Sequence, residues 1–146
     1  MEISFRNEIS IESSVNLVYD FLRKMDNFSI WNYAVMSVEP IDGRRSEIYR
    51  LTRDLGQSTE TETVTIMESR QNRFLHFEAA GGRFPYEMKY ELQQAGNRTL
   101  LTNDVILKPE GVSRLLLNLF KGNIQSEVKN NLNVLKSIFE SNAVNK

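Results

Sequence analysis

The chain has 146 residues, of which 40% are hydrophobic and 25% charged, and its 18 basic and 19 acidic side chains give a formal net charge of −1. We expect one folded domain over residues 1–146, because this length and composition exclude a disordered, collagenous or disulfide-rich chain. With no cysteine and a single histidine, the chain lacks thiolate nucleophiles, cysteine-built zinc sites and pairs of imidazoles, so we expect neither a metal nor a cofactor.

The first predicted elements are a strand and two short helices. Apolar and polar residues alternate strictly over residues 2–11, which is the two-residue period of a strand with one buried face. Asn7 is the one polar residue on the apolar side. Helical spacing begins at Ser13 and Ser14, predicts a helix over residues 14–25, and is followed by a second short helix or turn over residues 26–32.

Residues 33–108 predict six antiparallel strands, separated by glycine-containing turns. Folding the chain about these turns gives a register in which apolar residues mostly face one another. The predicted pairs are Leu51 with Glu62, Tyr49 with Val64, Ala79 with Phe84, Phe77 with Tyr86, Leu75 with Met88, Leu92 with Leu101 and Tyr90 with Asn103. One side of the sheet is therefore apolar, with a few polar residues among the apolar ones.

The last predicted element is a helix of about 30 residues that ends near Asn142. Its apolar stripe repeats at steps of three and four, through Leu117, Phe120, Ile124, Val128, Leu132, Leu135 and Phe139. A helix with this stripe needs a sheet to cover it. Additional leucines near residues 115–119 and the helical Gly122 either form a flexible portal or close the end of the core.

Two segments resemble a known superfamily. ISIESSVNLVYDFLRKMDNFSIWN (residues 9–32) and NNLNVLKSIFES (residues 130–141) resemble the opening and closing elements of the START/birch-allergen-like superfamily, also called SRPBCC. The likeness is strongest to its small bacterial polyketide cyclase/dehydrase-like branch. The resemblance implies the α+β helix-grip fold: a curved seven-stranded antiparallel sheet wrapped around the long C-terminal helix, with two short helices after the first strand. It also implies a hydrophobic cavity between sheet and helix.

The inward positions of the sheet and the long helix supply the candidate ligand-binding residues. They are Tyr33, Tyr49, Glu62, Phe77, Tyr86, Met88, Tyr90, Asn103, Phe120 and Ile124. The tyrosines combine an apolar ring with a hydroxyl that can orient a ligand. Asn103 could bind a ligand oxygen, or be satisfied by water or by neighbouring tyrosine hydroxyls.

Three charged or titratable residues are interpreted separately. Glu62 is interpreted as solvated near the open edge of the sheet; if it were enclosed, it would be a weak candidate for a catalytic acid or base. Arg53 lies opposite Glu60 and is interpreted as part of a surface ion pair. His76 faces away from Leu75 and Phe77, so we expect it to point to solvent.

Partners and location follow from charge and hydropathy. A near-neutral chain has no overall field that would concentrate nucleic acid, so we expect no nucleic-acid partner. The opening residues lack the basic and then apolar pattern of a signal peptide, and no run of 18 apolar residues occurs. We therefore expect a cytoplasmic protein without stable membrane association, and the sequence names no protein partner.

Three functional hypotheses remain open. The scarcity of catalytic groups favours a non-enzymatic protein that binds, or binds and carries, a hydrophobic small molecule such as a lipid, isoprenoid or polyketide-like compound. The alternative is a metal-independent enzyme of the cyclase/dehydrase type, which predicts an enclosed Glu62 beside a tyrosine or an arginine. The third is a regulatory protein-interaction module that uses the apolar surface of residues 115–120.

Overall fold

The computed structural model describes residues 2–41, 47–82, 84–109 and 113–144, with the side chains of residues 113–120 and 142–144 outside the described part. Within these ranges the chain forms seven strands and three α-helices with one 3-10 turn. In chain order they are β1 (Ile3–Ile11), α1 (Val15–Arg23), η1 (Met25–Asn27), α2 (Phe28–Trp31), β2 (Val35–Pro40), β3 (Ile48–Asp54), β4 (Thr59–Arg70), β5 (Phe74–Ala80), β6 (Tyr86–Ala95), β7 (Arg98–Leu107) and α3 (Ser113–Val144).

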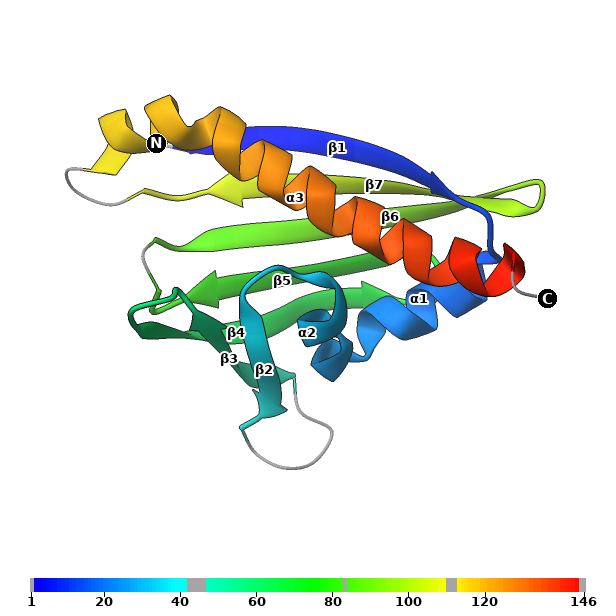
Figure 1. Ribbon diagram of the computed structural model, residues 1–146, viewed down its shortest axis with the longest axis horizontal. Helices are drawn as coiled ribbons and strands as arrows, with labels where there is room; N and C mark the ends of the chain where they lie inside the picture. The colour runs from blue at the N-terminus through cyan, green and yellow to red at the C-terminus, as the bar shows by residue number, and fades with distance from the viewer. Residues whose placement is uncertain (1, 42–46, 83, 110–112, 145–146) are drawn as a thin grey trace.

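The strands form a single antiparallel sheet in the order β1-β7-β6-β5-β4-β3-β2. All three helices lie on one face of this sheet, with α3 running obliquely across it and α1 and α2 beside its C-terminal half (Figure 1). The strands also change direction strongly from β1 to β2 in Figure 1, as the right-handed twist of a sheet requires. The predicted helix-grip α+β architecture is confirmed.

The core lies between the sheet and the helices. Alternate residues of β1 and β7 are buried, and Leu132 and Leu135 of α3 are fully buried against them in one hydrophobic cluster. The predicted helix over residues 14–25 ends at Arg23, and Met25 begins the 3-10 turn that leads into α2. No helix in the described part of the chain is long and apolar enough to cross a membrane.

The predicted register is correct at the β3–β4 and β6–β7 hairpins. Leu51 pairs with Glu62, and Tyr90 pairs with Asn103. At the β5–β6 hairpin the prediction is wrong by two residues: Phe77 pairs with Met88 instead of Tyr86. Pro85 has no N–H to donate to a ladder, so β6 begins only after it. Because the error is an even number of residues, every side chain stays on its predicted face.

The structure shows no packing role for Gly122. Its backbone lies in exposed helix, and no described atom comes within 4 Å of the position that an added Cβ would take. Glycine inside a helix costs about 1 kcal/mol relative to alanine. The Gly122→Ala variant should therefore raise the free energy of unfolding by about that amount, as measured by urea denaturation. A decrease would mean that the backbone at Gly122 needs a conformation that alanine disfavours.

Candidate functional site

A cavity of about 320 Å³ lies between the sheet and α3. Its apolar wall comes from alternate residues of β6 and β7 and from the stripe of α3. These residues, with Phe84 of the β5–β6 connection, are Phe84, Met88, Val105, Leu107, Ile124 and Val128. The polar residues of the lining come from the strands, from α3 and from the segment after α2, and they are Asn32, Arg53, Glu60, Glu62, Tyr86, Asn123, Glu127 and Asn131. The size and the mixed lining are typical of a small-molecule site.

Three of the polar residues are bonded to one another and form what we call the Arg53–Glu62–Tyr86 cluster. Arg53 donates from Nε to Oε2 of Glu62 over 2.6 Å and from a terminal nitrogen to the Tyr86 hydroxyl over 3.0 Å. Tyr86 in turn donates to Oε1 of Glu62 over 2.6 Å. Tyr86 stands on β6 and reaches Glu62 on β4 across β5. The β5 residue opposite Tyr86 is Ala79, whose short side chain leaves the path open.

This cluster corrects two interpretations of the sequence. Glu62 is not solvated, because only 4% of its surface is exposed. Arg53 is opposite Glu60 in the register, as predicted, but its guanidinium bonds the next inward-facing carboxylate along β4. Gly82 helps to close the site over Glu62, since a Cβ at Gly82 would lie 2.9 Å from Cγ of Glu62. The close approach of this connection encloses a carboxylate that would otherwise face water.

The protonation states of the cluster follow from its burial and contacts. Burial raises the pKa of Tyr86 well above its ordinary value; Arg53 opposes this effect, and the Glu62 carboxylate adds to it. Tyr86 therefore keeps its proton near neutral pH and acts as the donor to Glu62. Burial also disfavours the cation of Arg53, but Tyr86 and Glu62 outweigh this cost and raise the pKa of Arg53.

Arg53 is the member of the cluster that can offer further hydrogen bonds. Its side chain is 21% exposed, and it lines both this cavity and a neighbouring one. Two of its N–H groups are used within the cluster, whereas a guanidinium has five. Both oxygens of Glu62 already accept bonds. The cluster can thus donate further hydrogen bonds to an oxygen of a bound molecule.

A further polar residue is enclosed on β7. Asn103 has no exposed surface, and its Nδ2 donates to the backbone oxygen of Lys89 over 3.1 Å. No described residue donates a hydrogen bond to its Oδ1. Leaving a buried acceptor unsatisfied costs about 1–3 kcal/mol. On the neighbouring strand Asn7, also buried, donates to the backbone oxygen of Gln125 in α3.

The structure brings four of the ten predicted ligand-binding residues to the cavity: Glu62, Tyr86, Met88 and Ile124. Phe77 and Tyr90 instead belong to an aromatic group in the core, with ring centroids 6.3 Å apart. Tyr49 is half-buried and lines none of the cavities described for the chain, and Asn103 lies outside the cavity lining. The side chain of Phe120 lies outside the described residues, as do those of the predicted apolar surface at residues 115–119.

The inward orientation predicted for Tyr33 is wrong. Its side chain is 74% exposed and lines two outer cavities at the rim. Ala34 has a φ of 68°, in the left-handed region, and this turn breaks the alternation before β2 begins. Val35, and not Tyr33, is therefore the first buried residue of that strand.

The sequence analysis missed the polar residues of α3 that border the cavity. Asn123, Glu127 and Asn131 recur every four residues beside the apolar stripe, which is a signal that helical spacing could have revealed. Asn131 also joins α3 to the segment after α2. Its Oδ1 accepts from the backbone N–H of Tyr33 over 3.0 Å, and its Nδ2 donates to Oδ1 of Asn32 over 3.2 Å.

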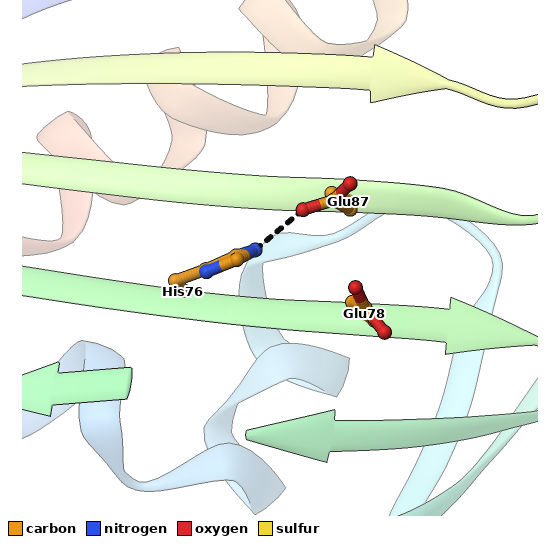
Figure 2. Close-up of side chains that lie close together, drawn as sticks. All are labelled: His76, Glu78 and Glu87. Atoms are coloured by element: carbon orange, nitrogen blue, oxygen red, sulfur yellow. Dashed lines mark hydrogen bonds and ion pairs between the residues drawn. The ribbon is translucent and has the colours of Figure 1, made fainter. Parts of the chain in front are cut away.

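The outer face of the sheet carries a different titratable group. His76 and Glu87 are hydrogen-bonded over 2.7 Å, and Glu78 lies beside them (Figure 2). Their ligand atoms lie within 4.8 Å of one another, a spacing that a metal ion could use. However, Nζ of Lys108 is 2.5 Å from Oε2 of Glu87 and already supplies a cation there. His76 is on the predicted outer face, although neighbouring side chains leave only 17% of it exposed.

Glu87 gives the protein a pH-dependent contribution to stability. Its hydrogen bond to Lys108 lowers its pKa below the ordinary 4.5; burial opposes this effect and His76 adds to it. A lowered pKa in the folded state stabilises the protein above the ordinary pKa, and the contribution disappears as the pH falls through the folded-state pKa. The stability difference between wild type and Glu87→Gln should therefore shrink between pH 6 and about pH 3, in urea unfolding. A difference that stays constant over this range would contradict the assignment.

Comparison with known proteins identifies a family whose model matches nearly the whole chain. Residues 2–140 match the family model described as polyketide cyclase/dehydrase and lipid transport. No curated protein matches the chain.

Solved structures with the same fold include three of particular interest. The di-domain aromatase/cyclase StfQ of the steffimycin biosynthetic pathway has a TM-score of 0.79 at 11% identity, over 98% of this chain and 52% of its own, so the chain spans about half of its length. A START superfamily protein from Mycobacterium smegmatis has a TM-score of 0.74 at 14% identity, over 94% and 97%. The Zhui aromatase/cyclase from Streptomyces sp. R1128 has a TM-score of 0.75 at 11% identity, over 96% and 94%. At these identities the likeness is one of fold.

Proposed function

The chain belongs to the polyketide cyclase/dehydrase and lipid transport family, and from this premise we propose that it binds a hydrophobic small molecule in the cavity between the sheet and α3. The observation that carries the proposal is a cavity whose lining combines an apolar wall with the Arg53–Glu62–Tyr86 cluster. The wall contributes affinity at about 25 cal/mol per Å² of apolar surface buried. The cluster orients the ligand by donating hydrogen bonds to an oxygen at its polar end.

The test is to fill the cavity without disturbing the surface. Ile124→Phe adds a ring where Ile124 lines the cavity, and Val134→Phe makes a comparable change at an exposed position of α3. With 1-decanol as the probe in isothermal titration calorimetry, Ile124→Phe should weaken binding at least about tenfold, which corresponds to about 1.4 kcal/mol. Val134→Phe should leave it unchanged. Equal binding by all three proteins would place the ligand elsewhere and contradict the proposal.

A second candidate function is catalysis of the cyclase/dehydrase type, and one observation favours it. Glu62 is enclosed beside both an arginine and a tyrosine, as that alternative requires. Against it, both oxygens of Glu62 already accept hydrogen bonds from Arg53 and Tyr86 before any substrate is bound. The candidate predicts that the protein converts a linear poly-β-keto thioester to a cyclised product and that Glu62→Gln stops turnover while the substrate still binds. If the wild type binds the thioester without converting it, the catalytic candidate is contradicted and only the binding function is supported.

A further inference from the structure

The cavity stops one residue pair short of the buried asparagine of β7. Met88 and Val105 are opposite each other on β6 and β7, and both line the cavity. The next inward-facing pair along these two strands is Tyr90 and Asn103, and neither belongs to the lining. One inward-facing pair away from Met88 in the other direction, Tyr86 is opposite Leu107 and takes part in the Arg53–Glu62–Tyr86 cluster.

The side chain of Asn103 is satisfied on one side only. Its Nδ2 donates to the backbone of Lys89, which fixes the orientation of the amide and turns Oδ1 away from that contact. Oδ1 has no donor among the described residues, although Asn103 has no exposed surface. Buried polar groups are almost always paired, so an unpaired buried acceptor at the end of a cavity indicates a site for a donor.

Met88 lines the cavity and also contacts the side chain of Asn103. Its sulfur lies 3.8 Å from Nδ2 of Asn103, and its side chain is only half-buried. Methionine is unbranched, with three rotatable bonds, and adapts its shape at low cost. A change of the Met88 rotamer therefore extends the cavity toward Asn103 and needs no movement of the sheet.

We propose that Asn103 is the inner polar contact of an elongated ligand that turns Met88 aside and carries an O–H or N–H donor at its inner end. The inference rests on the proposed function and specifies its ligand. Tyr86 and Tyr90 are four residues apart on β6, which corresponds to about 13 Å along a strand. The ligand is then an apolar chain or ring system with a polar group at each end. The Arg53–Glu62–Tyr86 cluster holds its outer group and Asn103 its inner one.

Two probes of equal length test this inference. Decane-1,10-diol carries a hydroxyl at both ends, and 1-decanol carries one. If Asn103 receives the second hydroxyl, the wild type should bind the diol about fivefold more tightly in calorimetry. If no acceptor is there, the diol must bury an unpaired hydroxyl and should bind more weakly than 1-decanol. The sign of the affinity difference between the diol and 1-decanol therefore decides whether Asn103 receives the second hydroxyl. If neither probe binds, the proposed function itself is overturned.

Variants and a spectroscopic readout complete the test. Asn103→Leu should reverse the order of the two probes, while Asn16→Leu on the exposed side of α1 should preserve it. Met88→Ile should abolish the preference for the diol, because a β-branched side chain is stiff and cannot turn aside. If Asn103→Leu does not fold, the side-chain amide resonances of Asn103 in the wild type replace it: the diol should shift them more than 1-decanol does. Equal shifts, or a preference for 1-decanol, would overturn the inference.

Discussion

Replacing Glu62 with alanine should lower the free energy of unfolding by about 3 kcal/mol, the lower end of what removing one partner of a buried ion pair costs. The loss leaves the guanidinium of Arg53 and the hydroxyl of Tyr86 without the carboxylate that both contact. The lower end is expected because the Arg53 side chain retains some exposure and can be partly solvated. Urea unfolding, followed by the fluorescence of the single tryptophan, measures the change.

The control for this prediction removes the pair as a whole. Arg53→Met combined with Glu62→Leu and Tyr86→Phe replaces both charges and the hydroxyl with apolar side chains of similar size, so no group of the cluster is left unpaired. The triple variant should lose much less stability than Glu62→Ala, since a buried ion pair is often no better than a well-packed apolar one. A loss below about 1 kcal/mol for Glu62→Ala would show that the cluster behaves as a solvated surface pair.

Replacing Leu135 with alanine should also cost about 3 kcal/mol, within the 2–5 kcal/mol range for leucine at a buried position. Leu135 is fully buried in the core cluster beneath α3, so its removal deletes apolar contacts and leaves a cavity. The neighbouring Val134 is 43% exposed and provides the matched control. Val134→Ala should change the free energy of unfolding by less than about 0.5 kcal/mol. Equal effects of the two substitutions would mean that α3 is not anchored by its apolar stripe.

The fold was predictable from the sequence because its signals are local and periodic. Strict alternation over residues 2–11 placed Asn7 on the buried face of β1, where it is found. The stripe of α3 likewise identified Leu132 and Leu135 as core. The register error at the β5–β6 hairpin arose from the length of a connection that ends in Pro85, and its even size left the faces correct.

The candidate site was less predictable because its contacts are diagonal. Pairing alone sets Arg53 against Glu60, while the bond that forms goes to Glu62, two residues away. The reach of Tyr86 over β5 depends on the small size of Ala79, which no pattern of hydrophobicity shows. Tyr33 is exposed because the backbone of Ala34 is in the left-handed region. The sequence does not indicate this turn, since the residue there is alanine and not glycine.

The central claim, that the cavity between the sheet and α3 binds a hydrophobic molecule, is tested most directly by NMR of protein labelled at its methionine methyl groups and titrated with 1-decanol. Met88 lines the cavity, Met25 is buried in the core outside it, and Met36 and Met67 are exposed. We expect the methyl resonance of Met88 to shift in a saturable manner while those of Met36 and Met67 stay in place. A Met88 resonance that does not move, or equal shifts at the exposed methionines, would contradict the claim.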